Sequence, residues 1–256
     1  MTVDAALPHG CAERPLQPET PGAGRRDDLS MMLPINRGNI VNGSLHDDIY
    51  AALRQALIVG DLVPGQAFSI RTLAERFGTS LIPVRDALKR LVAERGLAML
   101  PNRTLCVPRM TRQRFQELLQ VRLSLETMLA RRATEFIGVE AIQELDGING
   151  EMQDAVPKDD VKRYLIANQR FHFGLYGAAR SAVTFPIVES LWMQVGPFLN
   201  GVFTSVGTRH ARDNHTEVLK ALRRRDAVAV GSAIGGDLAD AADVVLAHTE
   251  FVMDEV

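Results

Sequence analysis

The chain has 256 residues, of which 46% are hydrophobic, and a net charge of −2 at pH 7. This composition suits two small packed domains and excludes a polyanion binder that depends on overall charge. The charge is uneven, because residues 40–109 carry nine Lys and Arg against six Asp and Glu, whereas residues 110–256 carry sixteen against twenty. We therefore expect a modestly basic module joined to an acidic one. No signal peptide or long apolar run is present, so we expect a cytoplasmic protein without a membrane partner.

The first 39 residues are rich in proline, glycine and charge and show no sustained hydrophobic period. Such a composition buries too little apolar surface to fold by itself, so we predict a disordered tail over residues 1–39. Arg25 and Arg26 within it could contact a phosphate backbone, but a solvated tail is the simpler interpretation.

Three helices and a hairpin are predicted over residues 40–109. Apolar residues recur at helical spacing in LHDDIYAALRQALIVGDL, IRTLAERFG and TSLIPVRDALKRLVAERG. Ser80 can cap the third helix, and Pro83 falls in its first turn, where a missing N–H costs little. The stretch LAMLPNRTLCVP indicates two short strands joined by a Pro-Asn-Arg turn. This order of elements predicts a winged helix-turn-helix, a fold that places a helix in the DNA major groove.

The same residues resemble the DNA-binding domain of the GntR transcriptional regulators. The resemblance is carried by the turn in GDLVPG, by LAERFG, by PVRDALKRL and by ERGL before the wing. A single helix-turn-helix would be weak support, because such helix pairs also occur as structural units, but this combination of motifs is specific. The resemblance implies a transcriptional regulator that binds double-stranded DNA, at a pseudo-palindromic operator, as a homodimer.

Six residues are candidates for DNA contact. A recognition helix needs cations on its exposed N-terminal half, and Arg85 lies opposite the apolar stripe of the third helix. By resemblance, Arg71 and Arg85 match DNA-contacting positions, and Ser80 matches a cap whose neighbouring N–H groups face a phosphate. Leu81 and Ile82 stand where the family often has Arg and Thr, so specificity would depend on Arg85, the wing and methyl contacts. We expect DNA contacts from Arg71, Ser80, Pro83, Arg85, Asn102 and Arg103; the alternative for each arginine is a solvated or ion-paired surface charge.

The remainder of the chain, residues 110–256, is predicted to be an all-α bundle of about six helices. The run TRQRFQELLQVRLSLETMLARRATEF is amphipathic, and further amphipathic segments follow near 139–154, 159–179, 182–203, 209–224 and 227–250. The stretches ELLQVRLSLE, FHFGLY and NHTEVLKALRRRDAVAV resemble the FadR-type C-terminal ligand-binding domain, called FCD. The resemblance implies an effector-binding and dimerisation domain, and the family's effectors are mostly small organic acids.

Arg122 is a cation on an apolar helix face, so its guanidinium is expected to point toward the interior. A buried cation needs an anionic partner. Glu126, four residues later, is one candidate, and a carboxylate-bearing effector is the other, because guanidinium binds carboxylates bidentately. Both interpretations remain open from the sequence.

Three further segments each turn one polar side chain toward an apolar face: His172, His215 and Asp237. By resemblance, these match three of the four FCD metal ligands, which are usually one Asp and three His, and Asn168 matches the family's Asp. Two imidazoles, one carboxylate and an amide oxygen can bind Zn²⁺ or Ni²⁺. The alternatives are a polar effector pocket formed by the same residues, or buried histidines with ordinary hydrogen bonds.

A metal-dependent enzyme that uses His172, His215 and Asp237 is the alternative function. The sequence offers no additional general base or nucleophile for it, and an enzyme would leave the helix-turn-helix unexplained. We therefore expect a regulator and not an enzyme.

Overall fold

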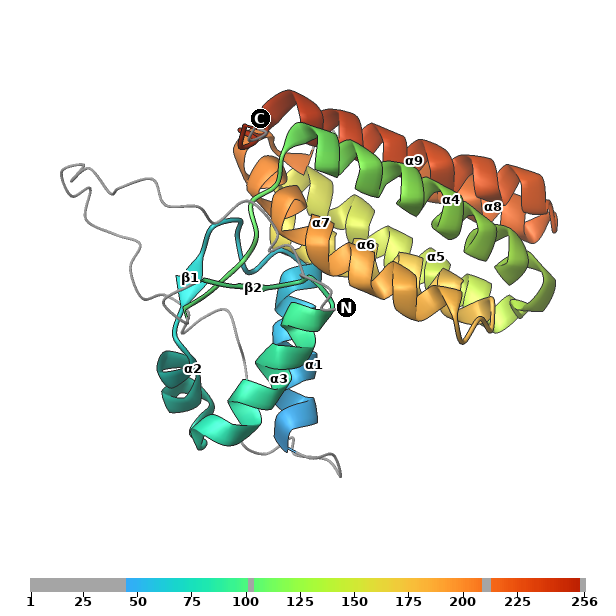
Figure 1. Ribbon diagram of the computed structural model, residues 1–256. Coiled ribbons are helices and arrows are strands. Elements are labelled where there is room, and N and C mark those ends of the chain that lie inside the picture. Colours follow the sequence, from blue (N-terminus) through green and yellow to red (C-terminus); the bar gives the residue numbers. More distant parts are fainter. Residues whose placement is uncertain (1–44, 101–103, 209–212, 254–256) are drawn as a thin grey trace, which may run out of the picture.

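The computed structural model describes residues 45–100, 104–208 and 213–253 (Figure 1). The tail predicted at 1–39 and the wing residues Asn102 and Arg103 lie outside these ranges. The described chain is mainly helical, with a small three-helix unit that carries a short sheet and a larger helical bundle. The predicted fold class, a winged helix-turn-helix followed by an all-α bundle, is confirmed.

The N-terminal unit packs three helices against a three-stranded sheet. Its elements are α1 (Leu45–Ile58), β1 (Ala67–Phe68), α2 (Ile70–Phe77), α3 (Leu81–Ala93), β2 (Ala98–Met99) and β3 (Leu105–Cys106). β3 lies between the other two strands and is antiparallel to both, with Cys106 opposite Ala67 on one side and Ala98 on the other. The predicted hairpin is β2 and β3. β1 was not predicted, because a strand of two residues has no hydrophobic period.

Local signals set the ends of the helices that form the helix-turn-helix. Ser69 caps α2 by accepting a hydrogen bond from the Thr72 N–H. Gly78 ends α2 in the left-handed conformation, with φ of 61°, which glycine adopts at little cost. Ser80 occupies the N-cap position of α3 as expected, but its side chain makes no capping hydrogen bond.

The C-terminal bundle contains six α-helices within the described residues. They are α4 (Arg112–Phe136), α5 (Val139–Ala155), α6 (Val161–Ala178), α7 (Thr184–Val206), α8 (Asn214–Arg223) and α9 (Ala227–His248), with a 3₁₀ turn, η2 (Val156–Lys158), after α5. The long helix α4 lies beside α9 (Figure 1), while α5 packs on α6. Asp213 and Asp226 cap α8 and α9 by accepting hydrogen bonds from Thr216 and Ala229. No helix of the described ranges is long and apolar enough to cross a membrane.

Arg225, in the turn between α8 and α9, is bonded to the end of α4. Its Nη1 donates to the carbonyl oxygens of Thr134, at 3.1 Å, and Ile137, at 2.7 Å, where α4 ends. A helix C-terminus leaves carbonyl groups without intrahelical partners, so this cation satisfies them from a distant part of the chain.

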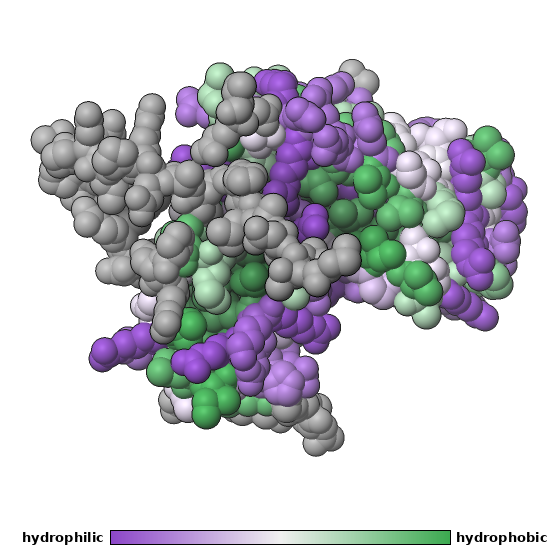
Figure 2. All heavy atoms as spheres, viewed as in Figure 1, coloured by the Kyte–Doolittle hydropathy of each residue, from purple (hydrophilic) through white to green (hydrophobic). Residues whose placement is uncertain are grey.

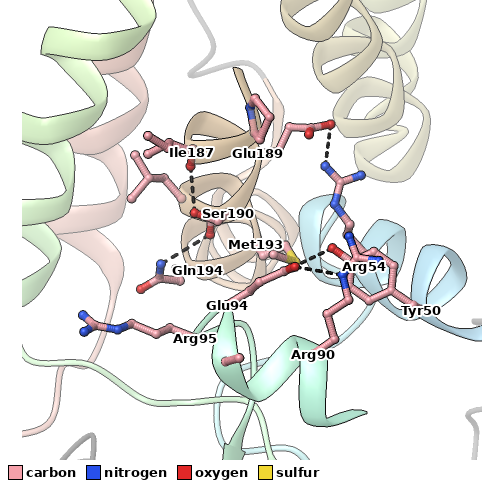
Figure 3. Close-up of a pocket in the computed structure, with 13 residues that line it drawn as sticks. Tyr50, Arg54, Arg90, Glu94, Arg95, Ile187, Glu189, Ser190, Met193 and Gln194 are labelled. Atoms are coloured by element: carbon pink, nitrogen blue, oxygen red, sulfur yellow. Dashed lines mark hydrogen bonds and ion pairs between the residues drawn. The ribbon is translucent and has the colours of Figure 1, made fainter. Parts of the chain in front are cut away.

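The two units meet where the end of α1 packs against α7. Gly196 on α7 approaches the main-chain carbonyls of Leu57 and Ile58 directly, which a residue with a side chain would prevent. Nearby, Asn200 Nδ2 donates to the Gly60 carbonyl oxygen at 2.6 Å. Figure 3 looks into a pocket of about 490 Å³ at this junction, with the Arg54–Glu189 ion pair across it. Backbone contact and polar links at the junction therefore add to an apolar core that continues from one unit into the other.

Candidate functional site

The N-terminal half of α3 is the exposed face of the helix-turn-helix. Val84, Leu88 and Leu91 are buried, whereas Leu81 and Ile82 expose 44% and 69% of their surface. Arg85 is exposed and makes no ion pair with any described residue, unlike Lys89, which pairs with Asp86 at 3.3 Å, and Arg90, which pairs with Glu94 at 3.1 Å. Arg85 therefore presents a cation whose hydrogen-bonding capacity is available to a partner.

A hollow of about 440 Å³ lies beside the start of α3, lined by Arg71, Ser80 and their neighbours. The Ser80 hydroxyl makes no cap bond, so both it and the first N–H groups of α3 are available to an anion. Arg71 is bonded instead to Glu75, at 2.9 Å, but the pair is highly exposed and so is weakly held. Pro83 is half-buried in the first turn of α3. Asn102 and Arg103, the predicted wing contacts, lie outside the described residues.

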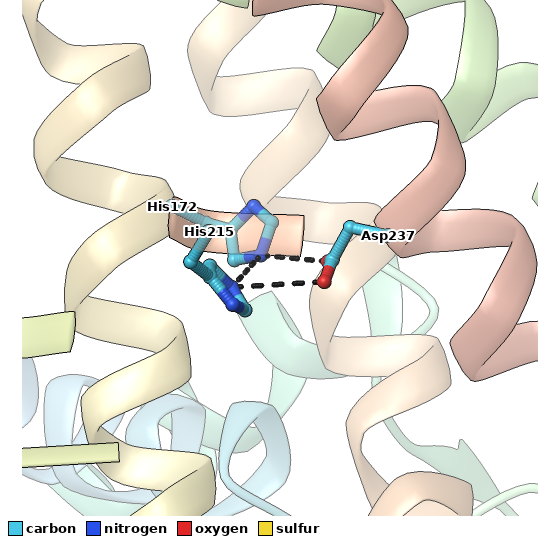
Figure 4. A group of neighbouring side chains, drawn as sticks. All are labelled: His172, His215 and Asp237. Atoms are coloured by element: carbon cyan, nitrogen blue, oxygen red, sulfur yellow. Dashed lines mark hydrogen bonds and ion pairs between the residues drawn. The ribbon is translucent and has the colours of Figure 1, made fainter. Parts of the chain in front are cut away.

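His172, His215 and Asp237 converge inside the helical bundle from three different helices (Figure 4). They come from α6, α8 and α9, and their potential ligand atoms all lie within 4.8 Å of one another. The two His Nε2 atoms are 3.2 Å apart, and Asp237 approaches His172 Nε2 at 3.1 Å and His215 Nε2 at 3.7 Å. We call these three residues the trio.

The separations in the trio fit a tetrahedral metal site. With metal–nitrogen and metal–oxygen bonds of about 2.0–2.1 Å, two ligands at the tetrahedral angle lie about 3.3 Å apart. The observed separations of 3.1, 3.2 and 3.7 Å are distributed around that value. Two imidazole nitrogens and a carboxylate oxygen are also a donor set that Zn²⁺ and Ni²⁺ accept.

The surroundings of His215 and Asp237 favour the protonation states that bind a metal. Burial lowers the pKa of His215 below its ordinary value, and the opposing effect of Asp237 does not cancel it. Burial raises the pKa of the Asp237 carboxyl, but neighbouring groups, His215 foremost, outweigh it and bring that pKa below its ordinary value. A metal ligand must be deprotonated, so both shifts favour binding.

A buried hydrogen-bond network lies directly behind His172. Its Nδ1 is 2.9 Å from the Tyr176 hydroxyl, which is 2.8 Å from Glu126 Oε2. Trp192 Nε1 donates to the same carboxylate oxygen at 3.0 Å, and Arg122 Nε donates to Oε1 at 2.7 Å. The network therefore connects α4, α6 and α7 behind the trio.

Arg122 points inward, as predicted, and its side chain is only 7% exposed. The guanidinium pairs with Glu126, which is one of the two anionic partners expected for it. The protein therefore supplies this partner from its own chain. The guanidinium also lies over the Trp192 ring, 5.0 Å from the centroid. Its charge still reaches the trio, because it is one of the groups that lower the pKa of Asp237.

Asn168 lies one helical turn before His172 and is half-buried. Within the described part of the chain, its side chain makes no hydrogen bond with the trio. Sequence reasoning did not assign a role to Tyr176, which only its four-residue spacing from His172 could have indicated.

Two family descriptions match the chain. "Bacterial regulatory proteins, gntR family" matches residues 45–107, and "FCD domain" matches residues 117–248. The chain is 27% identical over 209 residues to the HTH-type transcriptional regulator McbR of Escherichia coli, covering 80% of this chain and 88% of McbR. It is 23% identical over 203 residues to the gluconate operon transcriptional repressor of Bacillus subtilis, covering 75% and 82%.

Solved structures agree with these matches. The structure of E. coli McbR/YncC superposes with a TM-score of 0.76 at 26% identity, covering 79% of this chain and 97% of that one. A putative GntR regulator from Rhodococcus sp. RHA1 shares the fold, with a TM-score of 0.66 at 20% identity over 81% of this chain and all of that one. The chain belongs to the GntR family of bacterial DNA-binding transcriptional regulators and carries an FCD domain after its helix-turn-helix.

Proposed function

We propose that this regulator binds a pseudo-palindromic operator as a homodimer and that a small carboxylate effector, bound with a divalent metal, controls its DNA affinity. The observation that carries the proposal is the trio, which brings two imidazoles and a carboxylate from three helices to metal-ligand separations. The ion would be Zn²⁺ or Ni²⁺, held by His172, His215 and Asp237, with the Asn168 amide as the fourth ligand from the protein.

The charge of the proposed site favours an anionic effector. Two neutral imidazoles and one carboxylate leave a bound divalent ion with a net positive charge, and the ion supplies a Lewis-acid position for an effector oxygen when it is bound. The Arg122 guanidinium also acts on Asp237, but its charge is paired with Glu126, so the bound ion would supply the excess positive charge. An organic acid matches this field better than a neutral molecule does.

The DNA-binding part of the proposal assigns the base contact to Arg85 and phosphate contacts to Arg71, Ser80 and the wing residues Asn102 and Arg103. Pro83 would shape the first turn of α3 that approaches the groove. Arg85→Ala should weaken operator binding by about 1–3 kcal/mol, whereas Lys89→Ala on the same helix should change it less, because Lys89 already pairs with Asp86. A fluorescence anisotropy titration on the operator and on random DNA measures both. Equal losses on the two DNAs would contradict a base contact by Arg85.

The homodimer is supported by an apolar stripe on α4. Leu118, Val121, Leu125 and Met128 follow alternating spacings of three and four residues, and Val121 and Met128 are 45% and 47% exposed. Figure 2 shows hydrophobic side chains over the face where α4 and α7 lie. Val121→Asp should convert the dimer to monomers in sedimentation velocity, because it places a charge in the proposed interface. Val139→Asp, at an exposed position on α5, is the control, and a dimer unaffected by Val121→Asp would exclude this surface.

The metal and effector are tested together on the purified protein. Bound metal is counted by elemental analysis, and thermal shifts with a panel of small organic acids are recorded with and without chelator. We expect about one ion per chain in the wild type and none in His215→Ala, together with an acid response that chelator removes. A wild type that retains no metal when Zn²⁺ and Ni²⁺ are supplied would refute the metal part of the proposal.

A further inference from the structure

We infer that Tyr176 and Glu126 are positioning residues that hold His172 in the tautomer required for metal binding, with its proton on Nδ1 and a bare Nε2 directed at Asp237 and His215. The inference rests on the metal site proposed above and identifies what prepares that site. It follows from the directions of four buried hydrogen bonds.

Glu126 is the fixed acceptor of the network. It is completely buried, and it is contacted by Arg122, Trp192 and Tyr176. Guanidinium and indole groups can only donate hydrogen bonds, so Glu126 must accept from both of them. With Arg122 on Oε1, and Trp192 and Tyr176 on Oε2, Glu126 is the acceptor in every bond of the network.

The direction of the next bond follows from this. A phenol has one proton, and Tyr176 must use it toward Glu126 Oε2, 2.8 Å away, because the carboxylate cannot donate. Toward His172 Nδ1, at 2.9 Å, the Tyr176 oxygen can then only accept. His172 must therefore carry its proton on Nδ1.

The consequence appears on the other side of the imidazole ring. A neutral imidazole has one proton, so Nε2 of His172 is a bare lone pair. It lies 3.1 Å from Asp237 Oδ2 and 3.2 Å from His215 Nε2. A carboxylate oxygen and a bare nitrogen repel each other at this distance, and a cation between them removes the repulsion. The opposite tautomer would place an N–H where the ion must bind.

The function of Glu126 explains an otherwise costly arrangement. An ion pair buried this completely is often less stable than apolar side chains of the same volume, so the Arg122–Glu126 pair is weak support for a purely structural role. In metal sites, groups that orient a histidine from behind typically change metal affinity by about 10–100-fold when they are removed.

The test uses Tyr176→Phe, which removes the acceptor for Nδ1–H and little volume. In metal-free protein with ¹⁵N-labelled histidine, nuclear magnetic resonance should show His172 as the Nδ1–H tautomer in the wild type and as a mixture in Tyr176→Phe. In a competition titration with a chelator, Zn²⁺ affinity should fall by about 10–100-fold in Tyr176→Phe. Glu126→Gln should also mix the His172 tautomers, because an amide can donate as well as accept. It replaces Tyr176→Phe in the test if that variant does not fold.

Tyr50→Phe is the matched control. It also removes a phenol that donates to a glutamate, Glu94 at 2.6 Å, but in the DNA-binding domain. Its Zn²⁺ affinity and His172 tautomer should equal those of the wild type. A wild-type His172 protonated on Nε2, or a Tyr176→Phe protein with unchanged tautomer and affinity, would overturn the inference while the metal proposal stands. A wild type that binds no Zn²⁺ would instead refute the metal proposal, and the tautomer spectra would still be measured without metal.

Discussion

Gly196 lies on α7 where that helix meets the end of α1, and a methyl group has no space there. A Cβ at this position would overlap the carbonyl oxygens of Leu57 and Ile58, both of which are main-chain atoms. To relieve the overlap, α1 would have to retreat from α7 by about 1 Å, which a close-packed junction resists. We therefore expect Gly196→Ala to destabilise the protein and to loosen the contact between the DNA-binding and FCD domains.

Two opposing effects set the magnitude. Replacing glycine by alanine inside a helix usually stabilises by about 1 kcal/mol, because alanine loses less conformational entropy. Overpacking usually costs about 1–3 kcal/mol, and here the clashing atoms belong to the main chain, which cannot move aside as a flexible side chain would. A retreat of α1 would also stretch the bond from Asn200 Nδ2 to the Gly60 carbonyl. The net expectation is a loss of about 1–2 kcal/mol in the free energy of unfolding.

Gly201 provides the matched control, because it lies on the same helix and a Cβ there meets nothing within 4 Å. Gly201→Ala should therefore stabilise the protein by about 0.5–1 kcal/mol. Urea unfolding followed by circular dichroism measures both variants, and anisotropy on operator DNA shows whether loosening the junction changes binding. If Gly196→Ala proved as stable as Gly201→Ala, the close approach of α1 and α7 would not exist in solution.

Three further changes have defined outcomes. Burial and the bond to Glu94 raise the pKa of Tyr50 from 10.0 to about 12, so its contribution to stability is present below pH 10 and lost as the pH rises toward 12. The difference in urea midpoint between the wild type and Tyr50→Phe should therefore shrink over that range, and a constant difference would contradict the shift. Arg225→Ala should cost about 1–3 kcal/mol in the same assay, because it removes two bonds to the end of α4, whereas Arg224→Ala should cost little, because the Arg224 side chain bonds to no described residue. Ser80→Ala should leave the free energy of unfolding nearly unchanged and weaken DNA binding. Ser69→Ala should lower the free energy of unfolding by about 1 kcal/mol, because it removes the cap of α2. A larger loss of stability in Ser80→Ala than in Ser69→Ala would show that Ser80 has a structural role.

Much of the helical architecture could be predicted from the sequence, because it depends on local signals. The first helix was expected from Leu45 onward, and α1 covers Leu45–Ile58 of the described chain; the predicted bundle segments correspond to α5–α9 within a few residues. Hydrophobic periodicity, caps and glycine stops act over one or two helical turns, which a sequence displays directly. The exception was β1, which is strand only because β3 lies beside it.

The residues of the candidate site could be predicted from the sequence, but the distances between them could not. His172, His215 and Asp237 were expected on inward faces, and all three lie there. Their mutual distances depend on how α6, α8 and α9 pack, which no local pattern encodes.

The sequence by itself determined which helices form, which faces they bury, and that a GntR-type helix-turn-helix precedes an FCD domain. Only the tertiary structure decided the partners of the buried polar groups. Arg122 could have met an effector or Glu126, and packing placed Glu126 against it. The ring of His172 could have carried its proton on either nitrogen, and Tyr176, Trp192 and Glu126 meet behind it from three helices. Which group donates and which accepts in a hydrogen bond depends on all of its neighbours in space. The donors and acceptors of this network can therefore be assigned only from the folded structure.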